Sequence, residues 1–205
     1  YMICIAKVGA VWNKDRKVLD IYQKMRDVLQ KPIILLGMMG SGKSCIGEVL
    51  ARKGGLDFYD MDSLIVSEQG KNIPKIFEEH GEAYFRDLES RLLEGLLDKK
   101  EACVISTGGG IVTSPDNMDL IKRHGVSVWL LADIPVLLSR VGDGEGRPKL
   151  LQGDDPAGAL GRLLNAREAL YSKADIHIDN SRNDDPELVA EEILEAVVLC
   201  VDRTL

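Results

Sequence analysis

The sequence predicts an α/β protein in which a parallel sheet is flanked by helices on both faces. Short apolar runs alternate with longer amphipathic stretches, the pattern of buried strands connected by surface helices. The expected strands occupy residues 32–36, 56–59, 102–106, 126–131 and 176–178. Ligands bind such sheets at the carboxyl ends of the strands. Glycine-rich or acidic residues follow the first three strands, so we expect the binding site at that edge.

Helices are expected between these strands. They start after residue 44 and at residue 115, and they span 73–80, 82–97, 134–141, 156–171 and 186–201. Ser114 is suited to cap the helix that begins at Pro115, and Pro186 opens the last helix. Residues 142–146 read Gly-Asp-Gly-Glu-Gly, which favours neither regular structure, so a mobile lid is expected at about 142–155.

The first 30 residues have a different character. Apolar residues recur there at helical spacing: Val18, Leu19, Ile21, Tyr22, Met25, Val28 and Leu29. The stretch contains no Ser and three Asp, which is not typical of a transit peptide. We therefore expect a helical extension of unknown role at 1–30 and one α/β domain at 31–205.

Composition limits the classes of function. A net charge of −7 and a pI near 5.1 argue against binding to nucleic acid or to an acidic membrane surface. The four cysteines are scattered without a CxxC pair, as expected of reduced thiols in a cytoplasmic protein. No apolar run reaches the roughly 18 residues that suggest a transmembrane helix.

Residues 37–44 read GMMGSGKS, which fits the pattern G-x-x-x-x-G-K-[ST] of a P-loop. Its glycines let successive backbone N–H groups surround a polyphosphate, and the helix that follows presents further unpaired N–H groups. Lys43 is expected to reach the β- and γ-phosphates, and Ser44 to ligate Mg²⁺. The apolar strand before the loop and the helical pattern after it supply the context that the motif requires.

Two further stretches end at the same edge. Asp60 and Asp62 follow the second strand, and because alternate residues of a strand share a face, both carboxylates are expected to point toward the phosphates. One can hold Mg²⁺ through water, and the other can accept a hydrogen bond from the attacking hydroxyl. A triplet of glycines at 108–110 follows the third strand and indicates close approach of the backbone to a ligand.

Taken in order, these motifs resemble those of the shikimate kinases, which phosphorylate the 3-hydroxyl of shikimate with ATP. The resemblance covers about residues 32–200 and rests on GMMGSGKS (37–44), FYDMDSLI (58–65), IFEEHGEAYFRDLE (76–89), STGGG (106–110), GRPKLL (146–151) and LNAREALY (164–171). It implies a P-loop NTPase-type fold, Mg²⁺ as cofactor, and ATP and shikimate as partners. It also implies a place in the synthesis of chorismate and aromatic amino acids. We expect the protein to act as a monomer.

On the nucleotide side, the resemblance implies a set of ATP-binding residues: Gly40, Ser41, Gly42, Lys43, Ser44, Cys45, Arg140, Arg147 and Pro186. Ser44 and Asp60 are implied at the metal. Lys43 and Arg147 are implied to supply positive charge at the γ-phosphate, Arg147 from the lid. Cys45 stands where the family commonly has Thr, and we interpret it as a small side chain that faces the core.

On the acceptor side, the resemblance implies that Asp62 binds the shikimate hydroxyls and accepts or orients the proton of the attacking one. Arg86 and Arg167 are implied to clamp the carboxylate, which suits the planar guanidinium. Glu89, one helical turn after Arg86, is expected to hold that arginine in place. The backbone of Gly109 and Gly110 completes the expected acceptor site.

Two other functions stay open on the residues alone. The first is another small-molecule P-loop kinase, acting on gluconate or a nucleoside monophosphate. The combination of Asp62, Arg86, Gly109 and Arg167 argues against it, because these residues suit a compact hydroxylated carboxylate. The second is a non-catalytic nucleotide-binding module, against which the intact Lys43 argues.

Overall fold

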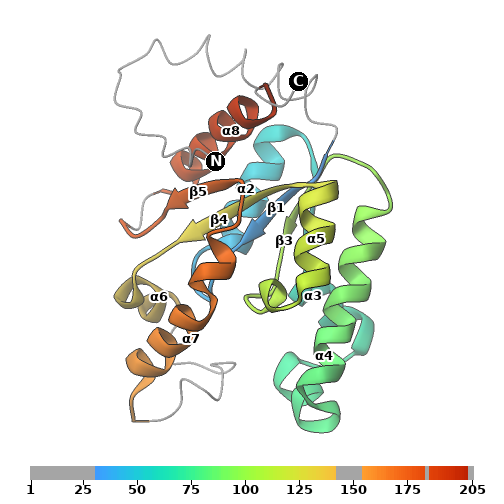
Figure 1. Cartoon of the computed structure of the whole chain (residues 1–205), viewed down its shortest axis with the longest axis vertical. Coiled ribbons are helices and arrows are strands. Elements are labelled where there is room, and N and C mark those ends of the chain that lie inside the picture. Colours follow the sequence, from blue (N-terminus) through green and yellow to red (C-terminus); the bar gives the residue numbers. More distant parts are fainter. Residues whose placement is uncertain (1–30, 142–153, 183–184, 203–205) are drawn as a thin grey trace.

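The computed structural model describes residues 31–141, 154–182 and 185–202. Its centre is a sheet of five parallel strands in the order β2–β3–β1–β4–β5 (Figure 1). The strands are β1 (Ile33–Leu36), β2 (Asp57–Asp60), β3 (Cys103–Ser106), β4 (Val126–Leu131) and β5 (Ile176–Asp179). The predicted α/β class and the five predicted strands are confirmed to within a residue or two at their ends.

Helices cover both faces of the sheet (Figure 1). On one face lie α2 (Lys43–Gly54) and α8 (Pro186–Asp202). On the other lie α4 (Ile73–Leu97), α5 (Pro115–His124), α6 (Ile134–Val141) and α7 (Pro156–Tyr171). A short 3₁₀ helix, η1 (Ile111–Thr113), joins the glycine triplet to α5.

The strands divide the apolar side chains between two cores. In β1, Ile33 and Leu35 pack with α2 and α8, whereas Ile34 and Leu36 pack with the helices of the opposite face. All four are completely buried. This two-sided burial explains why the strands read as continuous apolar runs, because successive strand residues point to opposite faces and both faces are covered.

A third, smaller core lies between α4 and the helix α3 (Met61–Gln69). It contains Ile65, Ile76, Phe85 and Leu88. Within α4 the backbone leaves helical geometry at Gly81, where φ is 81° and ψ is 174°. This break confirms the prediction of separate helices at 73–80 and 82–97.

The helix α3 was not predicted. The chain enters it directly from β2, because the side chain of Asp60 accepts a hydrogen bond from the amide of Ser63 and so caps the first turn. Asp62 therefore lies in the first turn of a helix, and the expectation that it extends the strand is wrong.

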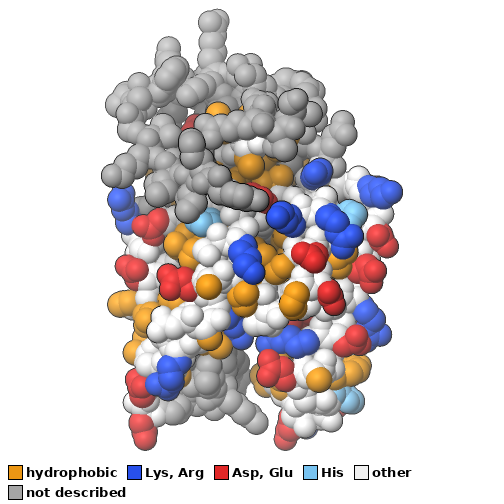
Figure 2. Space-filling model, viewed as in Figure 1, with side chains coloured by type: hydrophobic (Ala, Val, Ile, Leu, Met, Phe, Trp, Pro, Cys, Tyr) orange, Lys and Arg blue, Asp and Glu red, His pale blue; other side chains and the backbone are white. Residues whose placement is uncertain are grey.

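Several predictions concern residues outside the described ranges. The extension at 1–30, nearly all of the lid expected at about 142–155, and Arg147 belong to this group. Within the part of the chain that the structure describes, no helix is both long and apolar enough to span a bilayer. On the face that carries α4, α5 and α7, basic side chains are interspersed with acidic ones (Figure 2).

Candidate active site

The P-loop connects β1 to α2 at the carboxyl edge of the sheet. Gly37, Gly40 and Gly42 have φ angles of 143°, 76° and 95°, which side chains rarely allow. The ammonium group of Lys43 donates to the carbonyl oxygens of Gly37 at 2.9 Å and of Met38 at 2.8 Å. The lysine thus holds the loop in its curved form before any phosphate arrives.

Lys43 is strongly desolvated. Burial lowers its pKa from 10.5 to about 8, although the nearby carboxylates of Asp62 and Asp60 oppose the shift. The site therefore contains a cation that the protein solvates poorly. An anionic phosphate is the group that best compensates such a charge.

Beside this lysine, two oxygen ligands meet. The hydroxyl of Ser44 donates to the Asp60 carboxylate at 2.6 Å. Burial raises the pKa of Asp60, but hydrogen bonds from Ser44, Ser63 and Ser106 outweigh it, and the pKa falls below its usual value. A hydroxyl beside an ionised carboxylate fits Mg²⁺, which prefers oxygen and takes its other ligands from phosphate and water. Among the described residues, no cluster of three or more His, Cys, Asp or Glu side chains is arranged to hold a metal alone.

Asp62 reaches the same place from α3. It lines a cavity of about 740 Å³ together with Lys43 and Ser44. Burial raises its pKa, while the charge of Lys43 opposes that rise. A carboxylate with a raised pKa binds a proton more readily, which suits a group that accepts a hydrogen bond from a reacting hydroxyl.

The cavity gathers most of the predicted ATP-binding residues that the structure describes: Gly40, Gly42, Lys43, Ser44, Cys45, Arg140 and Pro186. Cys45 is exposed there, so the interpretation that it faces the core is wrong. The next residue, Ile46, occupies the core position instead. Ser41, a residue of the P-loop itself, is completely buried and does not line the cavity.

Asn180, which the sequence did not single out, ties the rim of the cavity to the P-loop. Its side-chain amide donates to the Ser41 carbonyl at 3.0 Å. The backbone carbonyl of Asn180 accepts a hydrogen bond from the guanidinium of Arg140 at 3.2 Å. Because Asn180 follows β5, it links the far end of the sheet to the phosphate loop.

On the acceptor side, Arg86 is held by two carboxylates. It donates to the buried Glu89 at 2.6 Å and through two nitrogens to Glu82 at 3.2 and 2.9 Å. The prediction that Glu89 holds Arg86 is confirmed. A Cβ atom added to Gly110 would overlap the Arg86 guanidinium, so the absence of a side chain at 110 leaves that group its place.

Arg167 approaches the glycine triplet from α7. Its guanidinium donates to the Gly109 carbonyl at 3.1 Å. The hydroxyl of Tyr171, one helical turn later, donates to the same oxygen. A Cβ on Gly108 would overlap Glu89 and lie 3.1 Å from Asp62. The glycine triplet therefore packs closely against the charged side chains of the acceptor site.

This chain is similar to known proteins over most of its length. A family model described as shikimate kinase matches residues 39–198. The chain belongs to the shikimate kinase family.

Relatives from several organisms are similar to this chain over most of its length. The shikimate kinase of Ruegeria pomeroyi is 43% identical over 169 residues, which cover 82% of this chain and 86% of the relative. That of Gloeobacter violaceus is 46% identical over 165 residues, covering 80% and 91%. A solved structure of shikimate kinase from Acinetobacter baumannii in complex with shikimate has a TM-score of 0.79 at 32% identity, covering 85% of this chain and 97% of that one.

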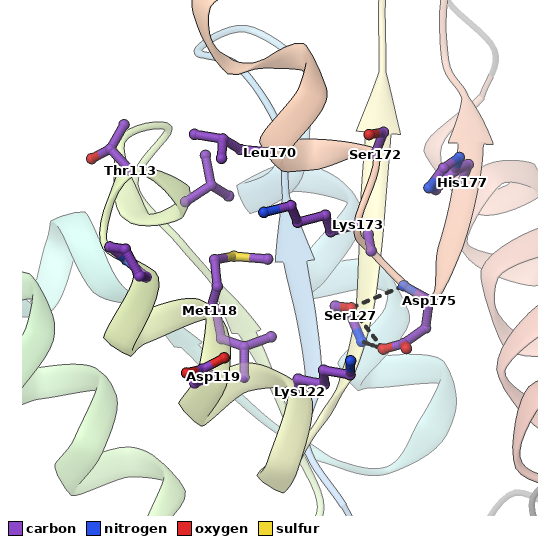
Figure 3. A pocket seen from close by; sticks show the side chains of 14 residues that line it. Thr113, Met118, Asp119, Lys122, Ser127, Leu170, Ser172, Lys173, Asp175 and His177 are labelled. Atoms are coloured by element: carbon purple, nitrogen blue, oxygen red, sulfur yellow. Dashed lines mark hydrogen bonds between the residues drawn. The ribbon is translucent and has the colours of Figure 1, made fainter. Parts of the chain in front are cut away.

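A second cavity of this shikimate kinase family member, about 690 Å³, lies between α5 and the end of α7 (Figure 3). None of the predicted site residues lines it. At its floor, the amide and hydroxyl of Ser127 donate to the Asp175 carboxylate at 2.9 and 2.7 Å. These bonds tie β4 to the start of β5, and we assign the cavity no ligand.

Proposed function

We propose that the protein transfers the γ-phosphate of ATP to the 3-hydroxyl of shikimate and that it requires Mg²⁺. Membership of the shikimate kinase family supports the reaction. The observation that carries the residue assignments is the convergence of the P-loop, Asp62 and the Arg86–Glu89 pair with Arg167 on one edge of the sheet.

On the nucleotide side, the P-loop amides and Lys43 bind the phosphates, and Ser44 and Asp60 hold the metal. When bound, Mg²⁺ neutralises charge that develops on the phosphate oxygens. Arg140 and Pro186 line the cavity where we place the adenine. Arg147, outside the described residues, is proposed to bring a further positive charge to the γ-phosphate from the lid.

On the acceptor side, Arg86 and Arg167 grip the shikimate carboxylate, and Gly109 and Gly110 offer backbone contacts. Asp62 accepts a hydrogen bond from the 3-hydroxyl and takes its proton as the bond to phosphorus forms. Because phosphoryl transfer needs little covalent help from the protein, positioning and charge supply most of the rate. That the protein acts as a monomer remains a prediction. The cytoplasmic location also remains a prediction.

A coupled assay of ADP release with Mg-ATP tests the reaction. We expect turnover with shikimate and little release with gluconate, nucleoside monophosphates or no acceptor. Omission of Mg²⁺ should abolish turnover. Activity with a different acceptor alone would overturn the assignment of Arg86 and Arg167.

The variant Asp62→Asn tests the role of the carboxylate. It should lose phosphate transfer by a factor on the order of 10² or more while it binds ATP normally, because general-base contributions reach 10²- to 10⁴-fold. Undiminished transfer in this variant would show that Asp62 does not act on the hydroxyl.

A further inference from the structure

Tyr171 is a completely buried tyrosine beside the acceptor site to which the reaction so far assigns no part. It is the last residue of α7, and its hydroxyl donates to the carbonyl of Gly109. Arg167 donates to the same oxygen from one turn earlier. One backbone carbonyl of the glycine triplet therefore receives two donors from a single helix face.

The ring of Tyr171 is fixed on several sides. It stacks on Trp129, with ring centroids 5.7 Å apart and planes inclined by 17°. Its hydroxyl also lies 3.7 Å from the sulfur of Met38 in the P-loop. Burial raises the pKa of the phenol to about 12, so the hydroxyl keeps its proton and remains a donor at neutral pH.

The carbonyl that it holds belongs to the glycine triplet. Glycine has little intrinsic preference among backbone conformations, so three glycines in a row do not determine which way their peptide groups face. A side-chain donor that holds one carbonyl selects that orientation. In this structure the selected orientation leaves Gly110 packed against the Arg86 guanidinium.

The two donors have different freedom. Arg167 is one of the two arginines that we propose for the substrate carboxylate, so the substrate competes with the Gly109 carbonyl for its N–H groups. Tyr171 has no such second task, and its packing keeps it in place. When Arg167 turns away, Tyr171 still satisfies the part-buried Gly109 carbonyl.

We propose that Tyr171 is a positioning residue for the acceptor: it holds the Gly109 carbonyl so that Arg167 can bind the substrate carboxylate without loss of the loop conformation. This inference rests on the proposed shikimate kinase function. Loss of the Tyr171 hydroxyl should therefore weaken acceptor binding selectively. When no acceptor is bound, Arg167 still donates to the Gly109 carbonyl.

The variant Tyr171→Phe tests the proposal, since it removes one oxygen atom and keeps the ring. Steady-state kinetics with Mg-ATP should show a rise in KM for shikimate on the order of tenfold, the size expected for one lost hydrogen bond. KM for ATP and kcat should stay within about twofold, and the melting temperature should change little. Calorimetric titration of shikimate should show the same loss of affinity.

Ser172→Ala is the matched control. It removes a neighbouring hydroxyl whose hydrogen-bond partner, in the part of the chain that the structure describes, is the Ala169 carbonyl of the same helix. It should leave both KM values unchanged. Trp129→Phe is a second comparison, because it reduces the packing on the tyrosine ring and keeps the hydroxyl. It should lower the melting temperature more than Tyr171→Phe does, and raise KM for shikimate less.

An unchanged KM for shikimate in Tyr171→Phe would overturn the inference. So would equal effects on both substrates together with a large fall in melting temperature, which would indicate a purely structural role. Wild-type protein without shikimate turnover would instead contradict the proposed function, so the two failures are distinguishable.

Discussion

At the scale of single residues, the site depends on charges that the protein solvates incompletely. Lys43 is buried, and its hydrogen-bond partners among the described residues are two backbone carbonyls. The buried Asp62 carboxylate lies near it. Glu89 is also buried, and burial raises its pKa although Arg86 opposes the shift. Such groups are poised for charged ligands, since each gains more from a new partner than an exposed group does.

The pH dependence of activity should report Lys43. With a pKa of about 8, the amine of Lys43 loses its charge above that pH when no phosphate is bound. We expect kcat/KM for ATP to fall by about tenfold per pH unit above pH 8, because this parameter reports the free enzyme. Bound phosphates favour the ammonium form, so kcat should fall only at higher pH. A flat profile of kcat/KM between pH 7 and 10 would contradict the assignment.

Lys43 also affects the pH dependence of stability. Whereas kcat/KM should fall as the pH rises, the stability contribution of this lysine should increase. Its pKa is lower in the folded state than the ordinary value of 10.5, so between about pH 8 and 10.5 the unfolded chain binds more protons. The contribution of Lys43 to stability therefore rises with pH in this window. Urea unfolding should show that any stability advantage of Lys43→Met over wild type shrinks from pH 7.5 to pH 10. An advantage that grows would show that the sign is wrong.

Gly110 offers a steric test of Arg86. Its φ of −97° is open to alanine, so Gly110→Ala acts through its Cβ, which overlaps the guanidinium. We expect KM for shikimate to rise at least tenfold, because a displaced arginine loses its bidentate geometry. KM for ATP and the melting temperature should remain close to wild type. Normal shikimate kinetics would show that Arg86 tolerates the shift.

At the scale of elements, α4 connects the small third core to the main body of the protein. The break at Gly81 separates a first segment, which packs on α3, from a second segment that carries Arg86 and Glu89. The direction in which these side chains point therefore depends on one backbone conformation at residue 81.

Two glycines in this helix give a matched pair of variants. An added Cβ has free space at both Gly81 and Gly95, so only the backbone distinguishes them. Gly81→Ala should lower the free energy of unfolding by about 1–3 kcal/mol, because its φ and ψ are almost confined to glycine. Gly95→Ala should raise it by about 0.5–1 kcal/mol, since alanine favours a helix interior. Denaturant unfolding measures both, and equal effects would contradict the argument.

At the scale of the whole molecule, the shikimate kinase family model matches residues 39–198, a range that holds nearly all of both main cores and all the proposed site residues. A chain that begins at Lys31 should therefore fold, with a melting temperature within a few degrees of the full chain and similar kinetics. Circular dichroism and the ADP assay check this. A large loss of either would assign the extension at 1–30 a structural or catalytic role.

Much of this architecture could be predicted because the signals are local. Glycines and prolines bound the apolar strands, and the P-loop carries its own conformational code in residues 37–44. The start of α3 was missed although Asp60 is a good capping residue, since the preceding apolar run favours a continued strand. The direction of Cys45 depends on the path of the P-loop above it, which spacing alone does not give.

The contacts that were missed join distant parts of the chain. Tyr171 acts on Gly109, 62 residues away in sequence, and Asn180 acts on Ser41, 139 residues away. Neither residue type carries a motif of its own. Such contacts depend on the strand order, in which β5 and the end of α7 return to the edge where β1 and β3 end.

The central place of β1 also has a consequence for synthesis on the ribosome. Its two neighbours, β3 and β4, begin only at Cys103 and Val126, so β1, the first of the five described strands to emerge, has to wait for both partners. Until then the backbone N–H and C=O groups on both of its edges are open to pairing with other nascent chains. We expect chains stalled before residue 103 to be recovered in aggregates or with chaperones, and chains released after residue 131 to escape that fate progressively. The strand at the centre of the finished sheet is thus exposed to mispairing while the protein is being made.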